Sequence, residues 1–207
     1  MKKKTNSLGY KIFRPFFYIF MKLYYNPKIY GKENISKKGA LIIASNHTKG
    51  VDPWVIGMST PRAVHFLAKK ELHDGKFGFI FRFLGTVPVD RKSKDENAKE
   101  KSLELLRLGE VYAIFPEGTI NRKKEDILLP FKFGAVSFAS KTDTPIIPAA
   151  IYGTYKFRSK NLSIMFGRPF KVGNMTLEKA NERLRKEVEK LYLKQEKLDK
   201  ERKKTNE

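Results

Sequence analysis

A histidine and an aspartate in the first third of the chain have the types and the spacing of a base and its orienting group. Asn46 and His47 follow the apolar segment at residues 40–44, and Asp52 comes after four intervening residues. A brief, isoleucine-rich run bounded by polar residues predicts a buried strand, which would place His47 at a strand end. Asp52, one loop away, would accept from one imidazole nitrogen and leave the other free to take a proton.

The same stretch has a purely structural interpretation. Asp52 followed by Pro53 is typical of a helix start, with Asp52 as the N-cap and Pro53 at the first helical position. His47 would then be an ordinary turn residue. The two interpretations stay open at this point.

Two further motifs end predicted strands. The motif FPEGT, residues 115–119, contains Gly118, which allows close approach of a backbone whose N–H groups can hold an anion. The motif VPVDR, residues 87–91, ends in Arg91, whose planar guanidinium matches a phosphate group. Taken singly, the first motif is also typical of a plain turn and the second of a surface ion pair.

Apolar and amphipathic segments predict the elements that would position these motifs. Strand–helix alternation through the middle of the chain indicates an α/β fold, a mixed central sheet flanked by helices, with functional groups at strand ends. Thr176 would cap a final amphipathic helix, and the charged tail beyond Lys194 is expected to fray. Strands are predicted at residues 40–44, 63–67, 87–89, 111–115, 145–151 and 162–166, and helices from residue 52, at 77–84, at 95–110, in the second half of 128–142, and from 176.

The N-terminal part of the chain is apolar and aromatic. Residues 9–25 contain many Phe, Tyr, Ile, Leu and Met side chains, but the longest uninterrupted apolar run, residues 16–21, is far shorter than the ~20 residues that span a bilayer. Basic residues interrupt the segment at Lys11, Arg14 and Lys22. The pattern favours a helix lying in a membrane interface. The alternative is a helix packed on the domain's own core.

Composition limits the remaining possibilities. The chain has 207 residues and no cysteine, which suits one domain with a core and excludes disulfides, thiolate metal sites and a cysteine nucleophile. Absence of cysteine also suits an intracellular protein. The net charge of +21 favours anionic partners such as nucleic acid, anionic lipid, acidic proteins or phosphorylated small molecules, although a lysine-rich genome would produce part of it. No spacing of His, Asp and Glu indicates a metal site, and we expect no metal and no cofactor.

Taken together and in order, the motifs are more specific. NHTKGVDP, GTVPVDR, FPEGT and TPIIPA resemble the signature of the 1-acylglycerol-3-phosphate O-acyltransferases, also called lysophosphatidic acid acyltransferases. The segments KKEL, LPFKFGA and FGRP are also similar, and the resemblance covers about residues 31–172. Together with the N-terminal aromatic segment and the final amphipathic helix, it predicts a membrane-associating segment at 1–30, an acyltransferase domain at 31–175, and a C-terminal helix with a charged tail at 176–207.

The resemblance implies an acyl transfer from an acyl thioester to the free hydroxyl of lysophosphatidic acid, which gives phosphatidic acid. In the motif HX4D, His47 would be the general base and Asp52 its orienter. No covalent intermediate is needed, in agreement with the missing cysteine and the missing G-x-S-x-G motif. The implied donor is acyl-CoA or acyl carrier protein. The implied location is the cytoplasmic face of the cell membrane, peripheral or monotopic, on an anionic surface.

The resemblance also assigns the acceptor site, with departures. Arg91 would bind the acceptor's phosphate, and Glu117, Gly118 and Thr119 would position its glycerol part. The family often has serine where this chain has Lys49, and usually arginine where it has Ile120. We expect Arg122 to replace that arginine, with Lys123 and Lys49 as alternatives. Relatives that acylate lipid A often have glutamate in place of Asp52, so this aspartate favours a glycerolipid acceptor.

Two alternatives stay open. The same fold can acylate another acceptor, such as glycerol-3-phosphate or a different lysolipid. The more remote alternative is a basic nucleic-acid-binding protein. Against it, the aromatic residues are densest in one N-terminal stretch and no nucleic-acid-binding module is recognisable, so we expect no nucleic-acid partner.

Overall fold

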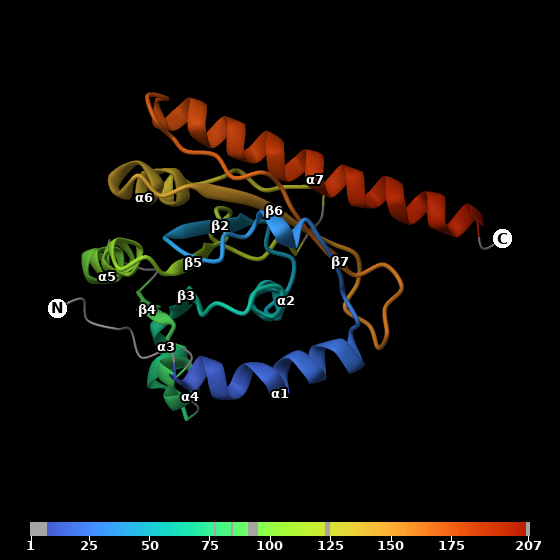
Figure 1. Cartoon of the computed structure of the whole chain (residues 1–207), viewed down its shortest axis with the longest axis horizontal. Helices are drawn as coiled ribbons and strands as arrows, with labels where there is room; N and C mark the ends of the chain where they lie inside the picture. The colour runs from blue at the N-terminus through green and yellow to red at the C-terminus, as the bar shows by residue number, and fades with distance from the viewer. Residues whose placement is uncertain (1–7, 77, 84, 91–94, 123–124, 206–207) are drawn as a thin grey trace.

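A computed structural model describes residues 8–76, 78–83, 85–90, 95–122 and 125–205. These residues form a seven-stranded sheet in the order β1-β7-β6-β2-β5-β3-β4, with helices on both faces (Figure 1). Strands β6 and β7 pair antiparallel, and all other neighbours in the sheet pair parallel. The α/β fold with a mixed sheet is therefore confirmed. The strands are β1 (Lys28–Tyr30), β2 (Leu41–Ser45), β3 (Val64–Lys69), β4 (Val87–Val89), β5 (Val111–Ile114), β6 (Ile146–Tyr152) and β7 (Ser163–Phe166).

The helices form two layers around this sheet. Helices α5, α6 and α7 cover one face, whereas α1 and α2 cover the other; the short helix α3 lies beside β3 and β4, and α4 packs against α3 and α1 (Figure 1). The bounds are α1 (Leu8–Tyr24), α2 (Asp52–Met58), α3 (Lys70–Asp74), α4 (Gly78–Phe83), α5 (Glu96–Arg107), α6 (Gly134–Thr142) and α7 (Leu177–Thr205), with a 3-10 turn at Lys32–Asn34.

Strand β2 is the centre of the fold. Ile42 and Ala44 belong to the core under α5, α6 and α7, whereas Leu41 and Ile43 belong to the core under α1 and α2. Both faces of a parallel central strand are buried, which explains why its sequence is a continuous apolar run. Burying each isoleucine side chain contributes about 1.5–3 kcal/mol, so this strand fixes the position of the loop that follows it.

The loops that carry the motifs leave the same edge of the sheet. Strand β2 pairs parallel with β5 on one side and β6 on the other, with Ala44 opposite both Ile114 and Pro148. Functional loops of α/β sheets gather at the carboxyl ends of parallel strands. The chain after Ser45 therefore emerges between the chain after Ile114 and the end of β6.

Helix α7 and the start of α2 differ from expectation. Helix α7 does not fray beyond Lys194 but continues to Thr205, because Gln195 and Asp199 are buried and Gln195 donates to the carbonyl of Ala150. Ion pairs one turn apart add support along its end. Asp52 is the first residue of α2 rather than its N-cap, since its carboxylate binds the preceding loop instead.

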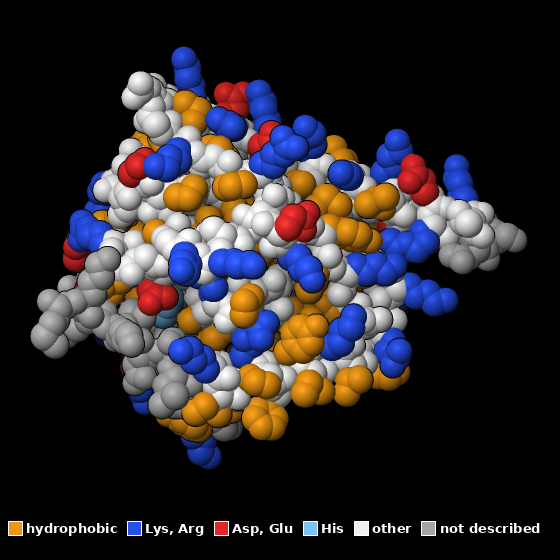
Figure 2. Space-filling model, viewed as in Figure 1, with side chains coloured by type: hydrophobic (Ala, Val, Ile, Leu, Met, Phe, Trp, Pro, Cys, Tyr) orange, Lys and Arg blue, Asp and Glu red, His pale blue; other side chains and the backbone are white. Residues whose placement is uncertain are grey.

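Helix α1 packs on the domain and is also exposed. Met21 is fully buried, and the ring of Phe17 stacks on Trp54 with centroids 3.8 Å apart. The opposite face is open to solvent, with Phe16 73% and Leu23 61% exposed. Hydrophobic side chains line the lower edge of the molecule where α1 runs (Figures 1 and 2). Within the described residues, no helix has the length and apolar character needed to cross a bilayer.

Candidate active site

The site is built around a histidine and a buried carboxylate. Nδ1 of His47 lies 2.8 Å from Oδ2 of Asp52. The carboxylate is fully buried, whereas 11% of the His47 side chain is exposed. A histidine whose Nδ1–H donates to a carboxylate keeps Nε2 as the atom that can take a proton. The predicted pair is therefore brought together, with the geometry of a base and its orienter.

Asp52 holds the loop between β2 and α2 in place. Its Oδ2 atom also accepts from the backbone N–H groups of Thr48 and Lys49, the latter at 2.8 Å. Its Oδ1 atom accepts from the Thr48 hydroxyl at 3.0 Å and from the Tyr155 hydroxyl at 2.5 Å. A charged group buried away from water requires such donors, because each replaces a lost water molecule.

Three neighbours fix the position of His47 itself. Its backbone N–H donates to Oε1 of Glu117 at 2.8 Å, and the ring of Phe115 stacks on the imidazole with centroids 4.0 Å apart. The buried amide of Asn46 pairs with both the N–H and the carbonyl of Ile151 at the end of β6. The histidine is thus held between β5 and β6.

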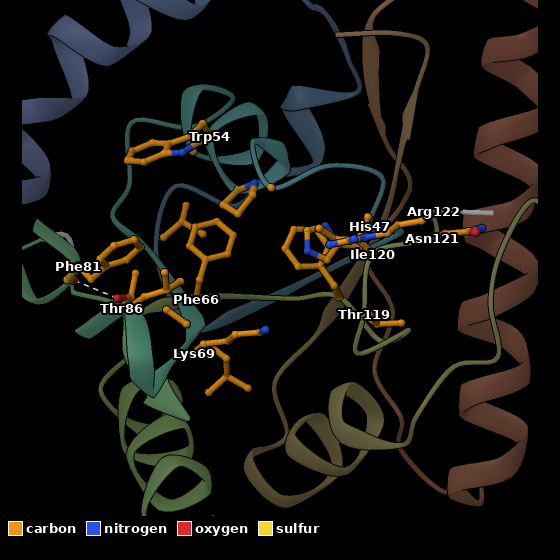
Figure 3. A pocket seen from close by; sticks show the side chains of 18 of the residues that line it. His47, Trp54, Phe66, Lys69, Phe81, Thr86, Thr119, Ile120, Asn121 and Arg122 are labelled. Carbon is orange, nitrogen blue, oxygen red and sulfur yellow. Dashed lines mark hydrogen bonds between the residues drawn. The ribbon is translucent and has the colours of Figure 1, made fainter. Parts of the chain in front are cut away.

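His47 lines a cavity of about 540 Å³. Figure 3 shows Thr119, Ile120 and Arg122 on the side of His47, and Trp54 and Phe81 on the far side. Further apolar walls come from β3 and its neighbours, namely Val64, Phe66, Leu67, Ala68, Leu72 and Phe115, whereas the polar lining includes Lys69, Thr86, Asn121, Glu125 and Asp126. The cavity joins a polar end at the histidine to a long apolar part.

The other predicted site residues lie at different positions relative to the cavity. Thr119 and Arg122 are exposed residues that line the cavity, whereas Lys49 is exposed and contributes its backbone N–H to Asp52. Gly118 has a φ of 70° and lies against the Lys132 side chain. Arg91 lies outside the described residues.

Glu117 is buried and engaged with the backbone. Only 3% of it is exposed, and its Oε2 atom accepts from the N–H of Leu129 at 3.1 Å while Oε1 accepts from His47. Burial raises the pKa of the Glu117 carboxyl above its usual value, although the two backbone hydrogen bonds oppose this effect. In this structure its carboxylate joins two loops; contact with an acceptor stays a prediction.

Two residues of the site were missed by sequence reasoning. Lys69, at the end of β3, extends into the cavity on the side of His47 (Figure 3), and the similar segment KKEL was the only signal for it. Tyr155, in the loop after β6, reaches Asp52 from 103 positions along the chain, and no spacing in the sequence indicates that contact.

Comparisons with known proteins agree with this architecture. The model of the family described as "Acyltransferase" matches residues 26–152. The chain belongs to this acyltransferase family. A curated 1-acyl-sn-glycerol-3-phosphate acyltransferase of Bacillus subtilis is 32% identical over 163 residues, which cover 76% of this chain and 80% of that protein. The family assignment makes the chain an enzyme and disfavours the nucleic-acid-binding alternative.

Further relatives are named for the same activity. The 1-acyl-sn-glycerol-3-phosphate acyltransferase of Borreliella burgdorferi is 35% identical over 135 residues, which cover 64% of this chain and 53% of that protein. The crystal structure of the 1-acyl-sn-glycerophosphate (LPA) acyltransferase PlsC from Thermotoga maritima superposes with a TM-score of 0.71 at 24% identity, covering 91% of this chain and 78% of that one. This likeness shows the shared fold. Among the described residues, no group of three or more acidic or histidine side chains is arranged to hold a metal ion.

Proposed function

We propose that this enzyme transfers an acyl chain from an acyl thioester to the free hydroxyl of 1-acyl-sn-glycerol-3-phosphate, which gives phosphatidic acid. The observation that carries the proposal is the His47–Asp52 pair, 2.8 Å apart, at the polar end of a largely apolar cavity. The Bacillus and Borreliella relatives, both named as 1-acyl-sn-glycerol-3-phosphate acyltransferases, support the choice of acceptor.

His47 acts as the general base in this proposal. Its Nε2 atom takes the proton of the acceptor's hydroxyl as that oxygen attacks the thioester carbonyl. Asp52 stabilises the imidazolium that forms and keeps the ring oriented. When the tetrahedral intermediate collapses, the carbon–sulfur bond breaks and the imidazolium returns the proton to the leaving thiolate. Atoms and charges balance without a covalent enzyme intermediate.

In this proposal the acceptor's phosphate binds to cationic side chains of the cavity, whose lining also includes Glu125 and Asp126. Arg122, in the loop after β5, and Lys69, the last residue of β3, both line the cavity, and Figure 3 shows the Lys69 side chain beside Phe66 with its nitrogen turned toward His47. Arg122 thus supplies a guanidinium near the position where Ile120 replaces the usual arginine. Arg91 and Lys49 remain candidates on sequence grounds, and residues 117–119 would position the glycerol part.

The apolar part of the cavity accommodates the acyl chain of the donor. Its walls are side chains of β3, α2 and α4, including Phe66, Trp54 and Phe81. The thioester carbonyl would lie at the His47 end, with coenzyme A or acyl carrier protein outside. Both carriers are anionic, and the net charge of +21 favours either of them.

Helix α1 places the site at an anionic membrane surface in this proposal. Its exposed face carries large apolar side chains, including Phe13, Phe16, Ile19 and Leu23. Phe157, 65% exposed, packs against Tyr24 at the end of this face. A basic, aromatic helix of this kind suits the headgroup region of the cytoplasmic leaflet, where the lysolipid is present.

The test is acyl transfer to lysophosphatidic acid by the purified full chain in vesicles, with acyl-CoA and acyl carrier protein donors side by side. We expect turnover with at least one donor, and a loss of about three to four orders of magnitude in His47→Ala and Asp52→Asn. Asp74→Asn, an exposed aspartate, is the matched control and should retain full activity. Turnover that survives in His47→Ala would overturn the base assignment.

The same assay decides the acceptor. Glycerol-3-phosphate and a lysophospholipid with a larger headgroup would run beside lysophosphatidic acid. A catalytic efficiency higher with either of these than with lysophosphatidic acid would overturn the proposed acceptor while leaving the acyl transfer intact.

A further inference from the structure

Tyr155 makes a contact that the acid–base pair does not explain. Its hydroxyl donates to Oδ1 of Asp52 at 2.5 Å, while the other carboxylate oxygen faces His47. Tyr155 is not among the residues that line the cavity. It therefore contacts the site through Asp52 rather than through the cavity.

The surroundings keep the Tyr155 hydroxyl in its protonated, donating form. Burial, and then the negative charge of Asp52, raise the pKa of the Tyr155 phenol far above its usual value, so the hydroxyl stays protonated and donating. Because Asp52 is fully buried, its charge is shared among a small set of donors rather than spread into water. Each donor then has a large effect on how strongly the carboxylate attracts the imidazole.

The loop that carries Tyr155 is fixed at both ends. Gly153 makes a turn at a φ of 101°, and the side-chain oxygen of Asn161 accepts from the backbone and hydroxyl of Thr154. The ring of Tyr155 meets the edge of Tyr25, with centroids 5.5 Å apart. The N–H of Arg158 donates to the carbonyl of Tyr24, which attaches the loop to the end of α1.

We propose that Tyr155 is a positioning residue for acyl transfer, holding Asp52 by its Oδ1 atom and setting how readily His47 takes a proton. The inference rests on the proposed function, in which His47 is the base. It adds a third member to the pair, supplied by the loop after β6.

The sign of the effect follows from the charges. A donor at Oδ1 withdraws negative charge from the carboxylate and weakens its attraction for an imidazolium. Without that donor, Asp52 holds the imidazolium more strongly, so His47 is protonated at a higher pH and fewer molecules carry a free base at neutral pH. A rotamer of Asp52 held less firmly would lower kcat further.

Other ionisable groups near His47 stay unchanged in the test. Glu117 accepts from its backbone N–H, and among the described residues Tyr10, Lys69, Arg122, Glu125 and Asp126 line the cavity. A shift caused by removal of one hydroxyl at position 155 is therefore assigned to the path through Asp52.

The experiment compares Tyr155→Phe with Tyr25→Phe, which removes a hydroxyl from the neighbouring ring without touching Asp52. The titration of His47 is followed by NMR, which is practicable because the chain has three histidines. The pH dependence of kcat and KM and the Tm are measured beside it.

In Tyr155→Phe we expect the His47 midpoint and the acid limb of the rate profile to rise by about half a pH unit, kcat to fall about ten-fold and KM to stay within about two-fold. Tyr25→Phe should match the wild type.

Each other outcome is decisive. A His47 midpoint and kcat unchanged in Tyr155→Phe, or equal shifts in both variants, would overturn the inference. Should Tyr155→Phe not fold, a ring-fluorinated tyrosine at position 155 keeps the shape and donates more strongly. Its expected effect is a midpoint shifted to lower pH, and no shift would count against the inference. Because the NMR titration needs no substrate, it stands even where wild-type enzyme fails to acylate lysophosphatidic acid, which would overturn the proposed function alone.

Discussion

The backbone N–H of His47 donates to Oε1 of Glu117, 2.8 Å away and 70 residues later in the chain. The second oxygen of Glu117 accepts from the N–H of Leu129. One buried carboxylate thus joins the loop after β2, the loop after β5 and the approach to α6. The position of His47, the proposed base, therefore depends on a side chain whose hydrogen bonds are made to backbone N–H groups.

The first prediction concerns pH and stability through Glu117. Its folded-state pKa is raised by burial, so the folded protein binds more protons than the unfolded chain above the ordinary value of 4.5. The stability contributed by the protonated form is fully present below 4.5 and is lost as the pH rises through the raised pKa. We expect Glu117→Gln to remove this decline, as measured by urea unfolding at several pH values.

The control for this prediction is Glu104→Gln, a change at an exposed glutamate on α5. It should keep the wild-type decline. Glu117→Gln also places an amide N–H against one of the two backbone N–H donors. We therefore expect the free energy of unfolding at acidic pH to fall by about 1–3 kcal/mol. An unfolding free energy whose decline with pH is the same in Glu117→Gln and wild type would contradict the prediction.

The contact between Glu117 and His47 also shows what the sequence can indicate. The strands before both residues were predictable, because brief apolar runs such as β2 and β5 are local patterns. Their parallel pairing then brings HX4D and FPEGT to one edge of the sheet. The family motifs indicated the chemistry, but not that both oxygens of Glu117 would be used by backbone N–H groups.

The features that the sequence did not predict depend on tertiary contacts. Strand β1 has three residues and is stabilised by pairing with residues of β7 that lie 135 positions later in the chain (163 − 28). Its local sequence is turn-rich and therefore does not indicate a strand. The last turns of α7 look like a charged tail until the burial of Gln195 and Asp199 is known. Tyr155 likewise reaches Asp52 by a contact that no period or spacing encodes.

The second prediction concerns acyl-chain length. Phe81 lies on the side of the cavity away from His47, and its carbonyl accepts from the hydroxyl of Thr86 at 2.9 Å (Figure 3). Phe81→Ala should lengthen the apolar space and shift the preferred donor to longer chains by about two to four carbons, since each buried CH₂ contributes about 0.8 kcal/mol. Competition between acyl donors of different length, with products resolved by mass spectrometry, measures the shift.

The matched control for Phe81 lies on the same helix. Phe79 is 60% exposed and does not line the cavity, so Phe79→Ala should keep the wild-type chain-length profile. A profile unchanged in Phe81→Ala, or changed equally in the two variants, would show that this wall does not limit the chain.

The third prediction concerns the acceptor's phosphate. Lys69→Ala and Arg122→Ala should each raise the KM for lysophosphatidic acid about ten-fold or more, because a charge-assisted hydrogen bond to phosphate is lost. The KM for the acyl donor should change little. Lys141→Ala, at an exposed lysine on α6, is the control. If the acceptor KM is unchanged in both cavity variants, the phosphate binds elsewhere. If it is unchanged in Arg122→Ala alone, Arg122 does not replace the missing arginine.

The last prediction concerns the exposed face of α1. Phe16→Glu and Leu23→Glu should each reduce binding to vesicles of phosphatidylglycerol and phosphatidylcholine about ten-fold, since both side chains are more than half exposed and would leave the lipid interface on charging. Because neither is part of the core, Tm should stay within about 2 °C of wild type. Sedimentation with vesicles measures the bound fraction. Leu193→Glu, at an exposed leucine on α7 across the sheet, should bind as wild type does. Equal binding by all variants would refute the proposed membrane-facing role of α1.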